Sequence, residues 1–504
     1  MVQGTASSVG KSLLCAGLCR LFRQAGYRVA PFKAQNMSLN SFATPEGLEI
    51  GRAQAVQAAA AGIPPHVDMN PILLKPEADS RSQVVVLGKP AGTSSARDYF
   101  ARKLDLWPVV SAALDRLRET CDVVVIEGAG SPAEVNLRSR EIVNMRVARY
   151  AQAPVLLVGD IDRGGVMASL VGTLDLLLPE ERELVKALIV NRFRGDVSLF
   201  KDGVTFLEER TALPVLGVVP FVRDLRIADE DSVALDDRRW VFKAAPDSTA
   251  AGVDVAIVRL PHIANFDDFS PLEAEAGAAV RYVERADDLG WPDVLILPGT
   301  KSTMADLAWL RETRLAERVV GLAAAGAAVI GICGGYQMLG RRILDPLHVE
   351  SPVGEVEGLG LLPVETAFAA EKTTVQVRGS VTATAGPLAG ARGTAVTAYE
   401  IHMGQTRLLA DGVEAPFAIG DRGDGCVGVG GNVVGCYLHG LFDSAPLRRA
   451  VLRWAAARKG VPLEALDAAP APEREVEAEL DRWAGVLRDS LDLQALWRIV
   501  GLEG

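Results

Sequence analysis

Two short stretches of this sequence carry side chains whose types and order suit particular chemistry. One is GTASSVGKS at residues 4–12, and the other is GICGG at residues 331–335. A glycine-rich turn that leads into a helix offers backbone N–H groups to phosphates. A cysteine between glycines, after an apolar run, is typical of a nucleophile on a sharp strand-to-helix turn. The sequence therefore predicts a phosphate-binding centre and a thiol centre in one chain.

The phosphate-binding stretch is a lengthened P-loop. Five residues separate Gly4 from Gly10, where the ordinary motif has about four. Lys11 would neutralise the terminal phosphates of ATP, and the Ser12 hydroxyl would hold Mg²⁺. A chance Gly/Ser turn would not account for the closing Gly-Lys-Ser. The residues that we assign to the nucleotide are Gly4, Thr5, Gly10, Lys11, Ser12, Lys33 and Asn191, the last as a reader of the adenine edge.

A magnesium site at this loop needs a second oxygen ligand. Glu127 follows the apolar run at 122–126 and precedes a flexible Gly-Ala-Gly. Parallel strands present ligands at their carboxyl ends, so we predict Ser12 and Glu127 as the metal ligands. The alternative for Glu127 is a solvated charge at a strand end. Asp160 and Asp162 end the next apolar run and could serve similarly.

Basic side chains gather at the same predicted strand ends and loops. Because the net charge of the chain is −11, this clustering indicates a pocket for anions. ATP accounts for some of these side chains, and the surplus suggests a substrate with several carboxylates. The residues concerned are Lys33, Arg52, Lys75, Arg81, Arg138, Arg140, Arg163, Arg192 and Arg194.

The thiol centre is predicted at Cys333, because the helix that follows the turn favours the reactive thiolate. A buried structural cysteine would leave the two flanking glycines unexplained. Its base should end another strand, and of the five histidines His439 follows a late apolar run at 433–438. His262 and His402 also end strands, and either could be structural or contact the substrate.

An oxyanion hole would complete the thiol centre. One N–H would come from Gly334, after the nucleophile, and another from Gly299 in the turn at 297–300. Loss of one such donor costs about 3 kcal/mol of transition-state stabilisation. We add Tyr336 and Gln337, which follow the elbow, to the residues expected around the substrate of this centre.

The pattern of apolar runs predicts an α/β fold with two parallel-sheet domains. Short Val/Ile/Leu runs alternate with helix-length segments, which is typical of βαβ units. We predict a P-loop domain at 1–225, a linker at 226–251 with a short edge strand at Trp240–Lys243, a second α/β domain of flavodoxin-like type at 252–445, and C-terminal helices at 446–504. Only Met1–Gln3 precede the P-loop where a full strand is expected, which favours a start further upstream.

Composition narrows the class of protein. The chain of 504 residues is 49% hydrophobic and 23% charged, an ordinary globular balance, and its net negative charge disfavours nonspecific binding to nucleic acid. Six scattered cysteines without a CxxC pair argue against a metal cluster and favour the cytoplasm. We expect no membrane span, since no apolar run reaches about 18 residues. The oligomeric state stays open.

The motifs resemble known families. The elbow, the Pro-Gly-Thr turn and the late histidine are similar to class I glutamine amidotransferases, which implies a thioester of glutamine on Cys333 and release of ammonia. Those enzymes usually carry His-x-Glu, whereas Gly440 and Leu441 follow His439 here. The site is therefore either a Cys–His dyad or has an acid from elsewhere in the chain. The long P-loop resembles that of dethiobiotin synthetase.

The two domains in this order resemble the cobalamin-pathway amidases. PFKAQNM (31–37), EGAGSPAE (127–134), DIDRGG (160–165) and YEIHMG (399–404) are similar to the cobyric acid synthase family in particular. The resemblance implies that ATP and glutamine are used to amidate the b, d, e and g side chains of adenosylcobyrinic acid a,c-diamide, a small corrinoid. The candidate substrate residues are Asn36, Arg52, Asp160 and Arg163.

Three other functions compete with this interpretation. A sister enzyme amidates the a and c side chains first, and a peptidoglycan isoglutamate amidase places its two activities on separate chains. A ParA-like ATPase switch would use the P-loop to bind partners and has no use for a reactive elbow.

Overall fold

The computed structural model describes residues 1–78, 81–222, 225–227, 252–460 and 476–502. The chain forms two compact units. The first unit comprises Met1–Ser38, Ile50–Glu230 and Glu475–Gly504, and the second comprises Leu39–Glu49 and Asp231–Arg474. The predicted linker lies almost wholly, and its predicted edge strand wholly, outside the described residues.

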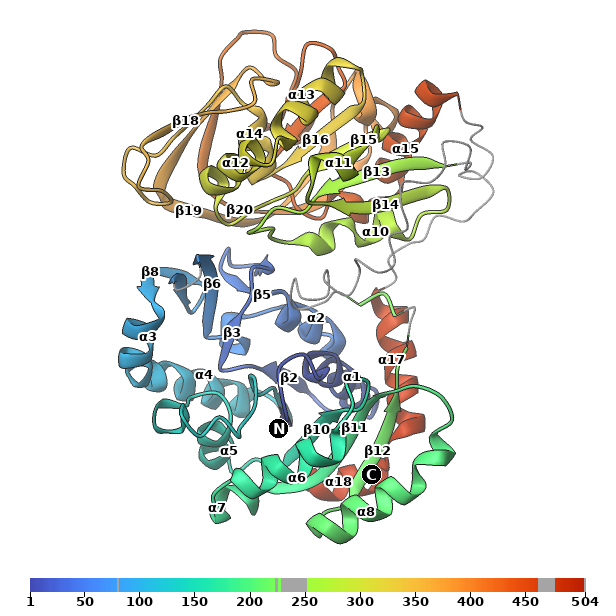
Figure 1. Ribbon diagram of the computed structural model, residues 1–504. Coiled ribbons are helices and arrows are strands. Elements are labelled where there is room, and N and C mark those ends of the chain that lie inside the picture. Colours follow the sequence, from blue (N-terminus) through green and yellow to red (C-terminus); the bar gives the residue numbers. More distant parts are fainter. Residues whose placement is uncertain (79–80, 223–224, 228–251, 461–475, 503–504) are drawn as a thin grey trace. The chain divides into compact units, whose positions relative to one another are not determined.

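The first unit is built on a parallel sheet (Figure 1). The strands of this unit, which belong to more than one sheet, are β1 (Val2–Gly4), β2 (Val29–Phe32), β3 (Gln35–Met37), β6 (Ile72–Ala78), β7 (Arg81–Val86), β8 (Lys89–Ser95), β9 (Val123–Ile126), β10 (Val155–Asp160), β11 (Val185–Phe193) and β12 (Val215–Pro220). Its helices are α1 (Lys11–Gln24), α2 (Arg52–Ala61), α3 (Ala96–Arg102), α4 (Trp107–Thr120), α5 (Met145–Ala151), α6 (Val166–Leu176), α7 (Pro179–Arg182), α8 (Lys201–Thr211), α17 (Val476–Ser490) and α18 (Leu493–Val500).

The order of the main sheet brings the predicted ligand strands together. β1, β10, β11 and β12 run parallel, and β2 runs parallel to β9. A parallel bridge between Val2 and Glu127 sets the end of β9 beside β1. Along β11, Ala187 and Ile189 face a core that includes α1 and α17, whereas Leu188 and Val190 face a core that includes α6 and α8. Both faces of the sheet are therefore covered, which explains its continuously apolar strands.

The second unit carries its own mainly parallel sheet, in the order β14-β13-β15-β16-β24-β23. The strands of the unit are β13 (Val253–Val258), β14 (Ala278–Val283), β15 (Val294–Leu297), β16 (Ala328–Ile332), β17 (Arg342–Leu344), β18 (Glu355–Glu357), β19 (Val364–Val381), β20 (Ala395–Leu408), β21 (Phe417–Ile419), β22 (Arg422–Asp424), β23 (Cys426–Val427) and β24 (Val433–Cys436). Its helices are α10 (Ser270–Glu273), α11 (Ala286–Leu289), α12 (Thr303–Glu312), α13 (Leu315–Ala324), α14 (Gly334–Leu339) and α15 (Ala445–Lys459).

The predicted α/β class with two parallel sheets is confirmed, and the structure adds antiparallel layers that we did not predict. In the first unit β6, β7 and β8 form an antiparallel meander beside β3. In the second unit β19 and β20 form a long hairpin that joins β17, β18, β21 and β22 in another sheet. A short two-stranded sheet pairs β4 (Ser41–Ala43) with β5 (Glu49–Gly51).

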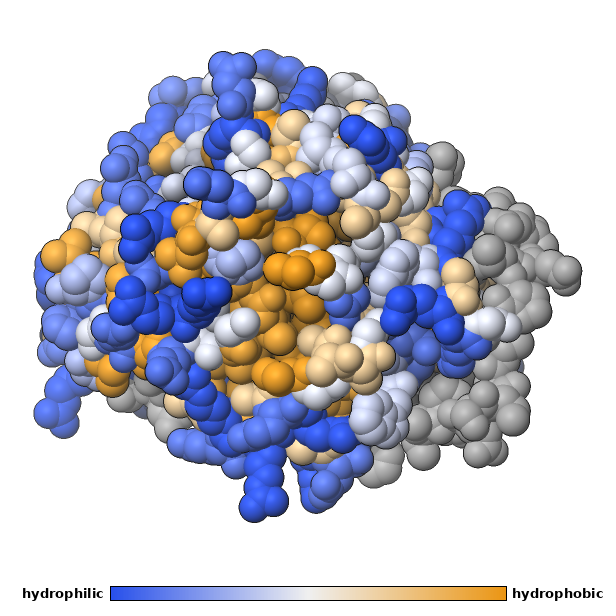
Figure 2. Space-filling view, turned by 90° about the horizontal axis from the view of Figure 1, so that it is seen from above, coloured by the Kyte–Doolittle hydropathy of each residue, from blue (hydrophilic) through white to orange (hydrophobic). Residues whose placement is uncertain are grey.

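The surface carries some exposed hydrophobic side chains, including Trp291, Leu347 and Val429 of the second unit. Figure 2, a view from above Figure 1, shows hydrophobic side chains gathered within a hydrophilic rim. Apolar side chains that are exposed singly are normal on folded proteins, whereas a gathered patch of this kind differs from that background. Among the helices of the described ranges, none is both long enough and apolar enough to cross a bilayer.

The C-terminal helices α17 and α18 belong to the core of the first unit. Trp483 is 2% exposed, and its indole N–H donates to the carbonyl of Leu13 in α1 at 2.7 Å. Gly17 of α1 lies against it, because a Cβ there would come within 2.7 Å of the indole nitrogen and 2.3 Å of Leu487. Arg20 forms ion pairs with Glu477 and Asp481 at 2.7 and 2.6 Å. The last helices therefore complete the layer over α1.

We predict that Trp483→Ala destabilises the first unit. Loss of a buried indole costs about 3–5 kcal/mol of unfolding free energy, and the Leu13 carbonyl would also lose the indole as a hydrogen-bond donor. Urea unfolding followed by circular dichroism measures this change. Leu199→Ala, at a side chain of the same unit that is 83% exposed, is the control and should change stability by less than about 0.5 kcal/mol. Equal effects of the two substitutions would contradict the packing role of α17.

Candidate active sites

The P-loop of the first unit lies between β1 and α1, as predicted. Gly10, the residue before α1, has no side chain that could cap the helix, so the first N–H groups of α1 can bind an anion. The Lys11 ammonium donates to the carbonyls of Ala6 and Gly130 at 2.9 and 3.2 Å, so it lies folded over the loop. In a P-loop, a lysine at this position reaches the β- and γ-phosphates of a bound nucleotide.

Asn191 supports the P-loop from the end of β11. Its amide N–H donates to the carbonyl of Val9 at 2.8 Å. Gly10 has φ 92°, and a Cβ there would come within 2.3 Å of the Asn191 amide nitrogen, so the position requires glycine. The side chain that we expected at the adenine edge is thus hydrogen-bonded to the loop itself.

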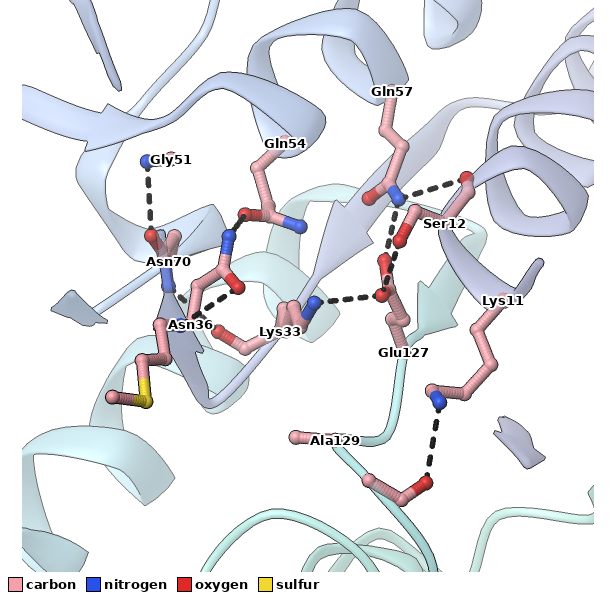
Figure 3. Close-up of polar contacts among 12 residues, drawn as sticks. Lys11, Ser12, Lys33, Asn36, Gly51, Gln54, Gln57, Asn70, Glu127 and Ala129 are labelled. Carbon is pink, nitrogen blue, oxygen red and sulfur yellow. Dashed lines mark hydrogen bonds and ion pairs between the residues drawn. The ribbon is translucent and has the colours of Figure 1, made fainter. Parts of the chain in front are cut away.

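Figure 3 shows that Glu127, which is 1% exposed at the end of β9, gathers three donors. The hydroxyl of Ser12 and the ammonium of Lys33 each lie 2.8 Å from its Oε1. The amide of Gln57, on α2, donates to Oε2 at 2.6 Å and to the Ser12 carbonyl at 3.1 Å. The alternative of a solvated strand-end charge is therefore wrong for Glu127. The structure brings Ser12, Lys33 and Glu127 together, and it adds Gln57, which we did not predict.

Asn36 belongs to a second amide network beside Lys33 (Figure 3). Its Nδ2 donates to Oε1 of Gln54 on α2 at 3.0 Å. Asn70 accepts from the Gly51 N–H at 3.0 Å and donates to the Lys33 carbonyl at 3.2 Å. The strand after β2 and the start of α2 are therefore held together by side-chain amides.

The other predicted substrate residues are less closely grouped. Asp160 pairs with Arg192 at 3.1 Å and accepts from the Asp162 N–H at 2.9 Å. Arg163 is exposed in the loop after β10, and Arg52 is half-buried at the start of α2. Several members of the predicted basic cluster have partners within the protein: Lys33 pairs with Glu127, Arg194 with Asp162, and Arg138 and Arg140 donate to the carbonyls of Leu176 and Ala101.

The elbow of the second unit has the strained backbone that its sequence predicts. Cys333, between β16 and α14, has φ 50° and ψ −108°, a conformation that costs about 1–3 kcal/mol for a residue with a side chain. Its neighbours must be small, because a Cβ on Gly334 would come within 2.6 Å of Thr300, and one on Gly335 within 2.0 Å of the Leu297 carbonyl oxygen. The thiol lies 3.6 Å from the carbonyl of Ile401.

His439 lies beside Cys333, since a Cβ on Gly299 would come close to both side chains. On its other side, Nδ1 lies 2.7 Å from Oδ2 of Asp268, whose Oδ1 accepts from the Gly440 N–H at 3.0 Å. Burial lowers the pKa of His439, but the charge and hydrogen bond of Asp268, and then Cys333, raise it more, so the pKa rises to about 10. The imidazolium form is therefore favoured at neutral pH, as a thiolate–imidazolium pair requires.

Gly299 lies beside this centre, because a Cβ on it would come within 2.9 Å of the His439 ring and 3.7 Å of the Cβ of Cys333. Tyr336 and Gln337 instead point into the interior. Gln337 accepts from Thr303 at 3.0 Å and donates to the hydroxyl of Tyr437 at 3.2 Å. We therefore find Gly299 and Gly334 beside the nucleophile, and Tyr336 and Gln337 packed beneath the elbow.

The remaining histidines have other partners. His262 pairs with Asp306 at 2.7 Å, and His402 stacks on Tyr437 with ring centroids 3.8 Å apart. His66 accepts from the Asp68 N–H at 3.2 Å, and His348 lies 3.1 Å from the carbonyl of Ser351. The choice of His439 as the base is consistent with this geometry.

Comparison with known proteins matches both units. Residues 1–234 match the model of the CobQ/CobB/MinD/ParA nucleotide binding domain, and residues 254–447 match that of the CobB/CobQ-like glutamine amidotransferase domain. Over 520 residues, covering 100% of this chain and 98% of the relative, the sequence is 55% identical to a cobyric acid synthase of Sorangium cellulosum. It is 52% identical to one of Moorella thermoacetica, covering 100% of this chain and 97% of the relative. The chain belongs to the cobyric acid synthase family.

Membership of the cobyric acid synthase family agrees with a nucleotide-binding unit followed by a glutamine amidotransferase unit. Family membership does not identify the acid of the second centre. The structure identifies it as Asp268, which lies 171 residues before His439 in the sequence and is hydrogen-bonded to it. Asp268 lies in a short 3₁₀ helix, η5 (Phe266–Phe269), after β13. Two acids between phenylalanines near a strand end were a signal in the sequence, but Asp267 and Asp268 could not be told apart without the fold.

We predict that Asp268→Asn lowers kcat for glutamine hydrolysis by about 100-fold, because the imidazolium loses the charge that stabilises it. The raised pKa of His439 keeps the ring protonated up to about pH 10. Without the carboxylate only the lowering effect of burial and the raising effect of Cys333 remain, so the alkaline limb of kcat/KM should move to lower pH. A pH–rate profile measures both effects. An alkaline limb that stays in place would contradict the role of Asp268.

Proposed function

We propose that this protein converts adenosylcobyrinic acid a,c-diamide into adenosylcobyric acid by amidating side chains b, d, e and g with ATP and glutamine. The observation that carries the proposal is the likeness, over the full chain, to relatives that are named cobyric acid synthase. Within that likeness, a P-loop with a buried acidic partner and a Cys–His–Asp centre occur in the same chain.

Glutamine would be hydrolysed at Cys333. The thiolate attacks the side-chain carbonyl carbon of glutamine, the C–N bond breaks, and the imidazolium of His439 gives its proton to the departing ammonia. The N–H groups of Gly334 and Gly299 would stabilise the oxyanion. Water then cleaves the thioester, which releases glutamate and restores the thiolate.

The acceptor carboxylate would be activated at the P-loop. A carboxylate oxygen of the corrinoid attacks the γ-phosphorus of ATP, and ADP leaves. Lys11 and Lys33 would balance the charge of the transferring group. Ammonia then attacks the carbonyl carbon of the acyl phosphate, and phosphate leaves with the amide in place.

Magnesium is the metal that the donors at the P-loop suit. The Ser12 hydroxyl and the Glu127 carboxylate are hard oxygen donors 2.8 Å apart. In the described ranges, no cluster of three or more His, Cys, Asp or Glu side chains could hold a metal. Mg²⁺ binds through one or two protein oxygens plus phosphates, so Ser12 and Glu127 would hold it with ATP, where it would neutralise phosphate charge.

The cysteines, the elbow and the fusion of the two units also bear on the location of the protein and on the rival functions. All six cysteines are free, which supports a reducing cytoplasm. The Cys333 elbow disfavours a ParA-like switch, and the fusion of both units disfavours the peptidoglycan enzyme. The synthase for the a and c amides shares both units, and the names of the relatives favour cobyric acid synthase over it.

Mass spectrometry of a corrinoid incubated with the protein, ATP, Mg²⁺ and glutamine tests the proposal. The expected result is a product with four additional amides from adenosylcobyrinic acid a,c-diamide. Accumulation of the a,c-diamide from cobyrinic acid would identify the sister enzyme instead. ATP turnover that ignores the corrinoid, with glutamine left intact, would refute both.

We predict that Cys333→Ser lowers glutamine-supported amidation by at least about 1,000-fold, because the nucleophile is lost. Amidation supported by ammonium salts should keep its wild-type rate, since the P-loop is untouched. Amide formation is measured by mass spectrometry with each nitrogen source.

Lys11→Ala is the matched counterpart. It should abolish amidation with either nitrogen source while glutamine hydrolysis by the second unit persists, measured as glutamate released. Loss of both nitrogen sources in folded Cys333→Ser would contradict the division of labour.

A further inference from the structure

A short segment that interrupts the first unit in the sequence folds as part of the second unit. Residues 1–38 and 50–230 belong to the first unit, whereas Leu39–Glu49 belongs to the second. We call residues 39–49 the strap. Strand β4 of the strap packs against β20, and Ala43 is buried in a small core with Tyr399 and Ile401. The strap therefore forms part of the fold that carries the glutaminase centre.

The strap contacts the turn that carries Asp268. The backbone N–H of Ser41 donates to Oδ1 of Asn265 at 2.8 Å, a buried hydrogen bond. Asn265 has φ 53° and makes no side-chain cap bond to η5, while its carbonyl accepts from the Asp268 N–H at 3.0 Å. The side chain of Asn265 thus ties the strap to the turn that presents the acid.

The strap also contacts Tyr399, the residue that supports the base His439. The ring of Phe42 packs against Tyr399 with centroids 4.9 Å apart. Tyr399 in turn stacks on the His439 ring at 5.2 Å, with 19° between the planes. The backbones of Tyr399 and His439 exchange two hydrogen bonds, of 3.2 and 2.9 Å. Phe42 therefore backs the ring that lies flat on the imidazole.

Two further contacts anchor the strap without involving the centre. The amide of Gln376 on β19 donates to the Ala43 carbonyl at 2.8 Å. At the C-terminal end of the strap, the carboxylate of Glu49 is buried and paired with the ammonium of Lys372. A buried ion pair fixes register, because breaking it leaves an uncompensated charge.

On both sides of the strap the chain continues into a network of side-chain amides, and one helix of that network, α2, also binds Glu127. Asn36 precedes the strap and Gln54 follows it, and their amides are bonded to each other at 3.0 Å. One turn further along α2, Gln57 donates to Glu127 and to the Ser12 carbonyl (Figure 3). A displacement of Glu127 or of the P-loop would therefore pull on α2, from which the strap is only a few residues away.

We propose that residues 39–49 position the Asp268–His439 pair and carry the state of the nucleotide site to it. Phe42 and Asn265 are positioning residues in this proposal, since neither touches the reacting atoms. The proposal rests on glutamine hydrolysis as the function of the second unit. If the strap acts in this way, the rate of glutamine hydrolysis in the second unit changes when ATP, Mg²⁺ and the corrinoid bind to the first unit.

The test uses the full chain and compares Phe42→Ala with Phe42→Tyr. Loss of the ring should lower kcat for glutamine hydrolysis by about 10-fold and leave KM for glutamine unchanged, because a misplaced base slows the chemical step without weakening binding. Phe42→Tyr keeps the ring and should restore kcat. Asn265→Gly, which tolerates the positive φ but removes the amide, should lower kcat in the same way. Amidation supported by ammonium salts should be unchanged in all three.

Coupling is measured as the ratio of glutamine hydrolysis with and without ATP, Mg²⁺ and adenosylcobyrinic acid a,c-diamide. For the wild-type protein we expect a ratio of about 10, within the usual range of coupling between two sites. In Phe42→Ala the ratio should fall towards 1. Phe200→Ala removes another half-buried phenylalanine, whose ring lies 5.5 Å from that of Phe193, and it should leave both kcat and the ratio unchanged.

The outcomes separate the possibilities. Wild-type kcat and ratio in Phe42→Ala would overturn the proposal, as would equal losses of glutamine-supported and ammonia-supported amidation, which indicate general misfolding. A wild-type ratio of 1 would overturn the coupling. Absence of any glutamine hydrolysis by the wild-type protein would instead refute the proposed function on which this inference rests.

Discussion

The carboxylate of Glu127 lies almost fully buried where β9 ends, and three separate elements are bonded to it. The P-loop reaches it through Ser12, the end of β2 through Lys33, and α2 through Gln57. A buried carboxylate is costly unless it is paired and hydrogen-bonded, so these donors are constrained to converge on one point. The geometry of the nucleotide site depends on this constraint, because the same hydroxyl and carboxylate are the oxygens that a magnesium ion would need.

At the second centre the buried charge that must be paired is a cation, the imidazolium of His439. The imidazole of His439 is 2% exposed, and burial alone would favour its neutral form. Asp268 reverses that preference because its carboxylate is 4% exposed, lies within hydrogen-bond distance and accepts from the Gly440 N–H as well. Each centre therefore uses a buried carboxylate to hold a positive charge, and each carboxylate is oriented by backbone or amide donors from neighbouring elements.

The sequence pattern predicted those features of the molecule that depend only on residues close together in the chain. The apolar runs of the parallel strands, the lengthened P-loop and the strained elbow at Cys333 all rest on neighbouring residues, and the structure contains each of them. Gln57, Asp268 and the strap depend on which strands adjoin in space. A glutamine in an alanine-rich helix looks like a surface residue until β9 is placed opposite it. The antiparallel layers were missed because their strands mix polar and apolar residues without a clean alternation.

The placement of the strap bears on a problem that any ammonia-using ligase must solve. Free ammonia is mostly protonated at neutral pH and then cannot attack an acyl phosphate, so nitrogen released before the carboxylate is activated is largely lost. Timing is therefore as important as proximity. A chain segment that starts at Asn36, supports Asp268 and His439, and returns to α2 provides a covalent route for timing that needs no new contact when ligands bind. Separate polypeptides for the two activities would need a surface interaction to do the same, and such an interaction depends on protein concentration.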